Sequence, residues 1–292
     1  MREARYFQTR NGLQLEYSVA GTGRPILMMH GGHSNCQEEF GYQELMDQGY
    51  AIITPSRPGY GKTDRLIGNS LKSACRAYAE LLDHLEVERV HLVAMSAGGP
   101  SAITFAALYP GRVSSLTLQS AVTKEWLTPQ DKEYKAARIL FHPAREKYSW
   151  KLVSLCTNLS PKFLFRQMLP SFSTLKLKEV QPYIQEGDLE AFRKMNSRQR
   201  SGSGFFIDLQ QTAQLDPAHS RQIRCPVLII HSKHDQAVRL DHALHASGAI
   251  PDALMLIVDT WGHLIWFGKG SELVHQETAA FLREADILVG IT

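Results

Sequence analysis

Residues 90–108 predict a buried strand, a tight turn and a helix in direct succession, and no other feature constrains the fold as strongly. The strand is Val90–Met95 and the helix is Pro100–Leu108, so Ser96 lies on the turn between them. Such a turn strains the backbone of its central residue and lifts the side-chain oxygen clear of the sheet. It therefore needs small neighbours, which Ala94 and Gly98 supply.

The helix that begins behind Ser96 points its N-terminus toward the serine hydroxyl. Its first N–H groups have no partner within the helix, and its dipole places partial positive charge at that end. An oxygen that becomes negative during a reaction is stabilised in such a place. The pattern therefore predicts that Ser96 is a nucleophile.

Composition limits the classes of protein to be considered. The 292 residues are 43% hydrophobic, enough for one large core or a core with a smaller covering domain. With 32 Lys and Arg against 29 Asp and Glu, the charge is too balanced to indicate nucleic acid or a membrane surface as partner. The four cysteines lie far apart without a C-x-x-C pair, which favours a reducing compartment over a disulfide framework or a zinc knuckle. With no apolar run of signal-peptide or membrane-spanning length, we expect a soluble cytoplasmic protein.

Strand-like and helix-like segments alternate along the first part of the chain, as is typical of an α/β fold with a mostly parallel sheet flanked by helices. An Asn-Gly turn predicts an antiparallel hairpin at the sheet edge. The expected strands are residues 4–9, 13–19, 26–30, 50–54, 89–95, 113–119, 226–231 and 253–258, and amphipathic helices are expected at 70–85 and 271–282.

The alternation stops at about residue 124, and helical patterns continue to about residue 221, with breaks expected at Pro143, Pro161, Pro170 and Pro182. We interpret residues 124–221 as a helical cap inserted after the sixth strand, and residues 1–123 and 222–292 as the core domain. Residues 125–222 contain 15 Lys and Arg against 10 Asp and Glu, a balance that fits an acidic acyl group or a solvated surface. The cap is expected over the carboxyl edge of the sheet, where parallel sheets bind ligands.

A serine hydroxyl becomes a good nucleophile when a histidine accepts its proton and a carboxylate orients that histidine. Asp235 follows the strand at 226–231, and His263 follows the strand at 253–258. The chain order Ser96, Asp235, His263 is that of nucleophile, acid and base in an architecture of this kind. Asp235 also fits a turn or a helix cap, and Asp241 is the alternative acid.

With these residues the chain resembles the α/β-hydrolase superfamily over nearly its whole length. The resemblance rests on the turn at Ser96, on His30-Gly31-Gly32, on the loop Arg57–Gly61 and on Gly262-His263. It implies the α/β-hydrolase fold and an oxyanion hole built from the backbone N–H groups of Ala97 and Gly32, with His33 as the alternative to Gly32. The family's Gly-x-Ser-x-Gly here begins with Ala94, so we expect the turn to form with a slight displacement.

Other motifs argue against cofactors and metals. Gly61-Lys62-Thr63 ends like a phosphate-binding loop, but Ser56 stands where the first glycine is required, and Pro58 has no N–H to offer a phosphate. The His-x-x-His pairs that begin at residues 30, 231 and 242 lack the glutamate of a zinc hydrolase. We expect neither cofactor nor metal, and we expect His30, Arg57 and Tyr60 to pack the loops beside the pocket.

The resemblance implies a hydrolase that cleaves a small or medium carboxylic ester, thioester, lactone or amide through an acyl-enzyme, with a small molecule as its only predicted partner. Five cap phenylalanines fit either a pocket lining or, for most of them, a cap core: Phe163, Phe165, Phe172, Phe205 and Phe206. Three alternatives remain, namely a carbon–carbon bond hydrolase, a proline iminopeptidase and a ligand-binding or signalling protein with little turnover. His33 and Ser34 replace the Pro-Gly expected of the iminopeptidase. The sequence indicates no oligomeric state.

Overall fold

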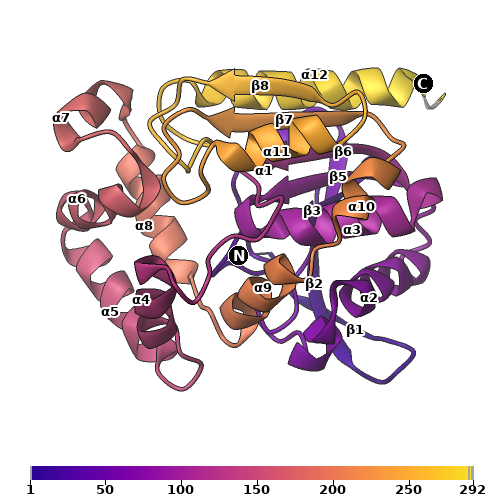
Figure 1. Ribbon diagram of the computed structural model, residues 1–292, viewed down its shortest axis with the longest axis horizontal. Helices are drawn as coiled ribbons and strands as arrows, with labels where there is room; N and C mark the ends of the chain where they lie inside the picture. Colours follow the sequence, from indigo (N-terminus) through magenta and orange to yellow (C-terminus); the bar gives the residue numbers. More distant parts are fainter. Residues whose placement is uncertain (1, 289, 291–292) are drawn as a thin grey trace.

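The computed structural model describes residues 2–288 and 290 and contains an eight-stranded, mostly parallel sheet flanked by helices, as predicted (Figure 1). The strands lie in the order β1-β2-β4-β3-β5-β6-β7-β8. The β1–β2 and β2–β4 pairs are antiparallel, and the remaining neighbours are parallel. The strands are β1 (Arg5–Gln8), β2 (Gln14–Ala20), β3 (Arg24–Met29), β4 (Tyr50–Pro55), β5 (Val90–Met95), β6 (Val113–Gln119), β7 (Val227–Ser232) and β8 (Leu254–Val258).

Hydrophobic layers cover both faces of the sheet, because neighbouring side chains of a strand point to opposite faces. On β5, Leu92 belongs to one layer and Val93 to the other. The first layer contains α2 (Leu71–His84), α3 (Gly99–Leu108) and α11 (Asp241–Ala249), and the second contains α1 (Tyr42–Asp47) and α12 (Ser271–Leu288). Because the strands from β4 to β8 are parallel, their carboxyl ends lie at one edge of the sheet, where the loops that follow them meet.

The chain between β6 and β7, here called the inserted segment (residues 120–226), is helical. It contains α4 (Lys132–Leu140), α5 (Glu146–Leu159), α6 (Pro161–Phe172), α7 (Leu177–Val180), α8 (Asp188–Arg198), α9 (Gly204–Ala213) and α10 (Pro217–Gln222). Helices α5 to α8 form a lobe beyond the tips of β7 and β8, whereas α9 and α10 lie against the core (Figure 1). No helix within residues 2–288 and 290 is both long and apolar enough to cross a membrane.

The prolines of the inserted segment do not all interrupt helices. Pro143 lies between α4 and α5, and Pro161 is the first residue of α6, as expected. The predicted break at Pro170 is wrong, because Pro170 lies inside α6, which continues to Phe172. A proline removes a single N–H donor, and the hydrogen bond from Ser173 N–H to Leu169 O (2.9 Å) closes the last turn after it.

Candidate active site

The turn after β5 holds Ser96 at φ +49°, the left-handed region that a serine rarely adopts. Two glycines make room for it: a Cβ on Gly98 would lie 2.2 Å from Met29 O, and one on Gly99 would lie 2.0 Å from Val122 O. Ala94 is fully buried in the hydrophobic layer beside α2 and α3. Its methyl group therefore packs into the core, and the strained turn forms with alanine at this position.

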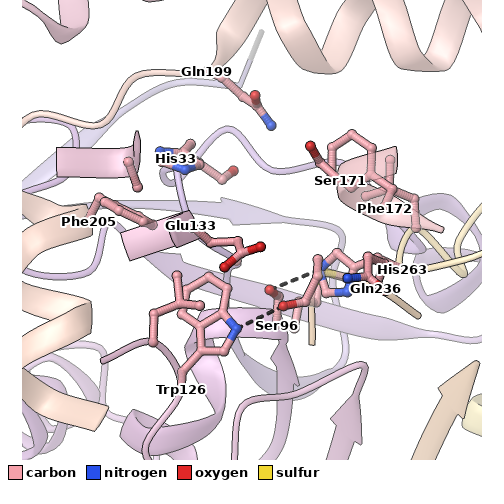
Figure 2. Close-up of a pocket in the computed structure, with 18 of the residues that line it drawn as sticks. His33, Ser96, Trp126, Glu133, Ser171, Phe172, Gln199, Phe205, Gln236 and His263 are labelled. Carbon is pink, nitrogen blue, oxygen red and sulfur yellow. Dashed lines mark hydrogen bonds between the residues drawn. The ribbon is translucent and has the colours of Figure 1, made fainter. Parts of the chain in front are cut away.

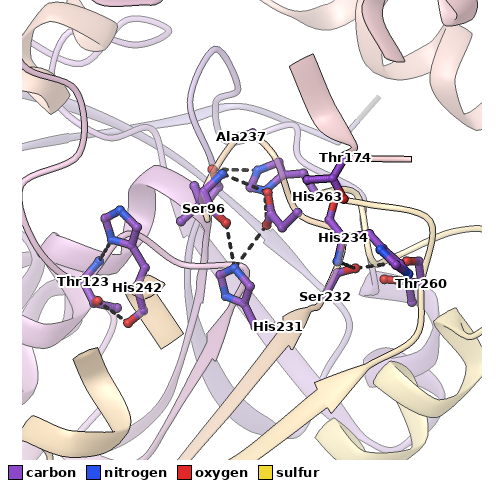
Figure 3. Close-up of polar contacts among 12 residues, drawn as sticks. Ser96, Thr123, Thr174, His231, Ser232, His234, Ala237, His242, Thr260 and His263 are labelled. Atoms are coloured by element: carbon purple, nitrogen blue, oxygen red, sulfur yellow. Dashed lines mark hydrogen bonds and ion pairs between the residues drawn. The ribbon is translucent and has the colours of Figure 1, made fainter. Parts of the chain in front are cut away.

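The structure brings the three sequence-predicted side chains together at the carboxyl edge of the sheet. His263 Nε2 lies 3.0 Å from Ser96 Oγ, and His263 Nδ1 lies 2.7 Å from Asp235 Oδ2 (Figure 3). Since a carboxylate only accepts, Nδ1 carries the proton, and Nε2 is free to accept from the serine. The alternative acid, Asp241, instead pairs with Lys124 at 2.7 Å near the protein surface.

A second histidine, His231, also contacts the carboxylate of Asp235. Its Nε2 lies 2.7 Å from Val238 O and 3.3 Å from Asp235 Oδ2, so this nitrogen carries a proton directed at both oxygens (Figure 3). Asp235 Oδ1 in turn accepts the N–H of Val238 at 2.8 Å. Burial lowers the pKa of His231, which favours the neutral ring. Sequence reasoning considered His231 only as part of a metal pair and missed this contact, because His231 lies on a strand, where a spacing of four residues indicates no contact.

The inserted segment directly contacts the loops that carry Asp235 and His263. The carbonyl of Phe172 accepts N–H groups from His263 (2.8 Å) and Gln236 (3.3 Å). A Cβ on Gly262 would lie 2.5 Å from this carbonyl, so the residue before His263 must be glycine. Ser173 also forms a backbone bridge with Asp235. The end of α6 thus helps to position both side chains, a role that no sequence motif indicates.

Two backbone N–H groups lie near the Ser96 turn without a partner among the described residues. They belong to Gly32 and Ala97, and a Cβ on Gly32 would lie 3.8 Å from Ala97 Cβ. The side chain of Tyr60 lies beside this loop, since a Cβ on Gly32 would lie 3.9 Å from its hydroxyl oxygen. Gly32 and Ala97 therefore stay the expected donors, with His33 as the alternative to Gly32.

A buried ion pair holds the loop that precedes Gly32. The Nε–H of Arg57 donates to His30 O at 2.8 Å, and the backbone N–H of Arg57 donates to His30 Nε2 at 2.9 Å. The guanidinium group also forms a two-bond pair with Asp208 of α9, whose carboxylate accepts the Tyr60 hydroxyl at 2.6 Å. The loop is therefore tied to the inserted segment, which extends the packing role expected of these residues.

Asp208→Asn is expected to lower the free energy of unfolding by about 3–5 kcal/mol, because it leaves the buried guanidinium group of Arg57 without its counter-charge. Burial raises the pKa of Asp208, whereas the charge of Arg57 lowers it. The cost of removing the carboxylate from water therefore offsets part of its attraction to Arg57. Urea unfolding at pH 7 measures the loss. Asp241→Asn, which breaks an exposed pair with Lys124, should cost less than about 1 kcal/mol. Similar losses in the two variants would contradict this account.

His33 links the same loop to the inserted segment a second time. Its Nδ1 lies 2.8 Å from Ser201 Oγ, and its carbonyl accepts the N–H of Arg200 at 2.8 Å. The ring stacks on Phe205 with centroids 4.6 Å apart. Burial lowers the pKa of His33 to about 3, so the ring is neutral near pH 7 and acts as a polar contact rather than a charge.

A cavity of about 880 Å³ opens above Ser96 between the core and the inserted segment (Figure 2). Ser96 and His263 lie in its wall, and its aromatic lining comprises Phe40, Trp126, Phe141, Trp150, Phe172, Phe205 and Trp266. Of the five predicted phenylalanines, Phe172 and Phe205 line this cavity, and Phe165 packs in the core. Phe206 is half-buried with its ring edge-on to Phe205, and Phe163 is 56% exposed. The sequence therefore indicated only part of the lining.

His242 contributes to the stability of the same region in a pH-dependent way. It is buried on α11, and its Nδ1 accepts the N–H of Thr123 at 3.2 Å, which requires an unprotonated nitrogen (Figure 3). Burial lowers its pKa to about 4 against the opposing effect of Asp241. Between pH 6.5 and 4 the unfolded chain therefore binds more protons at this residue, and stability falls as the pH falls.

From pH 7 to pH 5 the ring of His242 should account for about 2 kcal/mol of lost stability. His242→Gln keeps an acceptor for Thr123 but has no titrating group. Urea unfolding of this variant at the two pH values should therefore show a pH dependence smaller by about that amount. An unchanged dependence would mean that the titration of His242 is not linked to folding.

Comparison with known proteins places these observations among relatives. The sequence model of a family described as alpha/beta hydrolase fold matches residues 24–269. An uncharacterized hydrolase of Bacillus subtilis, YcgS, is 59% identical over 89% of this chain and 92% of its own. A 2-hydroxy-6-oxo-6-phenylhexa-2,4-dienoate hydrolase of Comamonas testosteroni is 26% identical over 92% of this chain and 91% of its own. The structure of an alpha/beta hydrolase fold protein from Nakamurella multipartita superposes with a TM-score of 0.82 at 23% identity, covering 96% of this chain and 99% of the other.

Proposed function

Because the chain belongs to the α/β-hydrolase family, we propose that this hydrolase is a serine enzyme that forms an acyl-enzyme on Ser96. The observation that carries the proposal is the continuous hydrogen-bonded line from Ser96 Oγ through His263 to Asp235, in the wall of a large cavity. In this proposal Ser96 is the nucleophile, His263 is the general base, and Asp235 orients the base.

The proposed reaction proceeds in two halves. His263 Nε2 takes the proton of Ser96 as Oγ attacks the substrate carbonyl, and the resulting oxyanion accepts hydrogen bonds from the N–H groups of Gly32 and Ala97. Each such donor stabilises the transition state by about 3 kcal/mol. The imidazolium, held by Asp235, then protonates the leaving group. In the second half His263 takes a proton from a water molecule as the water oxygen attacks the acyl carbon. The bond from that carbon to Ser96 Oγ then breaks, Oγ receives the proton back from His263, and the acid is released.

The proposed substrate is a small or medium carboxylic ester, thioester, lactone or amide with an apolar acyl group. The aromatic lining and the volume of the cavity support such a group. Residues 124–221 act in this proposal as the cap over the site. The mechanism requires no cofactor, since proton transfer and acyl transfer use side chains and backbone groups alone.

A carbon–carbon bond hydrolase is the second candidate, and the relative from Comamonas testosteroni supports it. The substrate in that protein's name carries a ketone and a carboxylate but neither an ester nor an amide, so its hydrolysis must cleave a carbon–carbon bond. The same three residues serve such a reaction if a proton reaches the carbon that leaves.

A fluorophosphonate probe followed by a substrate panel tests the proposal. The probe should label native protein at Ser96, and mass spectrometry of the digest locates the modified residue. The panel compares p-nitrophenyl esters, thioesters, lactones, amides and 2-hydroxy-6-oxo-dienoates by kcat/KM. Preference for the dienoates would replace the ester assignment. Absence of labelling and of turnover would leave a ligand-binding protein as the better account.

A further inference from the structure

The outer surface of the inserted segment carries a stripe of exposed apolar side chains. Tyr148, Leu152, Leu155 and Leu159 recur at helical spacing on one face of α5, and Phe163 follows on α6. Their side chains are between 56% and 77% exposed. Both helices lie in the lobe that stands away from the sheet (Figure 1). Apolar groups gathered in this way on an exterior face indicate a surface that binds something.

Basic residues border this stripe, and the exposed carboxylate of α8 that lies near its end, Glu190, is paired with Arg193, which also donates to Asn158 of α5. Between residues 134 and 178 nine residues are Lys or Arg, and the single acidic residue, Glu146, is buried against Arg200. The basic residues nearest the stripe are Arg145, Lys147, Lys151, Lys162 and Arg166, all exposed. None of the five forms an ion pair with a described residue. The stripe and these five residues are called the basic apolar face.

We propose that the basic apolar face binds the surface of an anionic lipid bilayer. A helix that lies on a membrane inserts Leu, Phe and Tyr at the boundary of the acyl chains, while Lys and Arg extend to the charged headgroups. A second copy of this chain is a poor occupant, because it would bring two sets of unpaired positive charges together. The nearly balanced charge of the whole chain predicts no membrane partner, because that sum does not show that basic residues gather on one face.

The cavity above Ser96 begins beside this face. Leu140, at the end of α4, lines the cavity and is 52% exposed, and its carbonyl accepts the hydroxyl of Ser149 of α5 at 2.7 Å. A bilayer in contact with α5 would therefore lie next to an edge of the cavity. This step rests on the proposed function: the favoured substrates are then medium-sized esters whose apolar acyl groups partition into lipid.

Binding is measured by sedimentation with vesicles, independently of turnover. We expect the full-length protein to sediment with vesicles of equal parts phosphatidylcholine and phosphatidylglycerol, to bind pure phosphatidylcholine weakly, and to be released by salt at about 1 M, where charges are screened within about 3 Å. Ser96→Ala should bind as the native protein does. Failure of the proposed catalysis and failure of lipid binding are therefore distinguishable.

Two pairs of variants test the two components of the face. Lys147→Gln with Lys151→Gln should weaken binding to the anionic vesicles about thirty-fold, since each basic residue near such a surface contributes about 1 kcal/mol. Leu152→Gln with Leu159→Gln should weaken it by about tenfold or more. The matched controls, Lys72→Gln with Lys269→Gln and Leu244→Gln with Leu273→Gln, alter exposed residues elsewhere and should bind normally.

Three results would overturn the proposal. They are no sedimentation with anionic vesicles, equal losses in the test and control variants, and a native dimer that Leu152→Gln with Leu159→Gln converts to monomers in light scattering. The last result would identify the face as a contact between copies of this chain. Thermal unfolding of each variant establishes that it is folded.

Discussion

Ser96→Ala is expected to lower kcat for a p-nitrophenyl ester by about a million-fold, because it removes the only atom in the proposed mechanism that attacks the carbonyl. The residual rate would come from the N–H groups of Gly32 and Ala97, which still polarise a bound carbonyl. The backbone strain at φ +49° is the same for alanine and serine, so the melting temperature should change little. Steady-state kinetics measures the loss of turnover, and a fluorophosphonate probe measures the loss of labelling.

Ser114→Ala is the matched control for this prediction. Ser114 is also buried, but it is the second residue of β6, at the end of the strand away from the carboxyl edge, so its replacement should leave both kcat and labelling intact. Retention of more than a small part of the activity by Ser96→Ala would exclude the acyl-enzyme and point to direct attack by water.

Asp235→Asn is expected to lower kcat by about ten thousand-fold. Both carboxylate oxygens accept hydrogen bonds: Oδ2 faces N–H groups of His263 and His231, and Oδ1 accepts the N–H of Val238. An amide offers one oxygen, so its NH₂ group must face either Val238 or the two histidines. In the second orientation His263 is held with its proton on Nε2, where it cannot accept the proton of Ser96.

The control for this variant is Asp241→Asn, because Asp241 is the alternative acid in the sequence. Its pairing with Lys124 leaves it no role at His263, so its kcat should change less than about tenfold. A large loss in Asp241→Asn together with a small loss in Asp235→Asn would reverse the assignment of the acid. Profiles of kcat/KM against pH for both variants distinguish lost orientation of the base from lost folding.

The fold was predictable because its signals are local. Each buried strand is a short apolar run, the Asn-Gly pair marks the hairpin, and glycines mark the turn at Ser96, so all eight strands were placed within about two residues. The order of Ser96, Asp235 and His263 at strand ends also predicted that their side chains would meet, and the structure places them within hydrogen-bond distance. Their catalytic roles remain proposals.

The contacts that the sequence did not reveal depend on residues far apart in the chain. Asp208 lies 151 residues after Arg57, and nothing near it indicates a buried ion pair rather than a solvated helix. The contact of Phe172 with the His263 loop is made by a backbone carbonyl, which every residue possesses. The helix through Pro170 was mispredicted because this proline removes only one helical hydrogen bond, and the turn after it still closes through the N–H of Ser173 and Leu169 O.

The carbonyl of Phe172 also limits how the inserted segment could move away from Ser96. Because it binds the backbone of His263 and Gln236, a hinge opening that carried the end of α6 outward would pull the imidazole from its place. An opening that keeps His263 in place must therefore leave residues 172–174 where they are. A chimera that received another enzyme's lid would likewise stay active only if its splice point left residues 172–174 in the host.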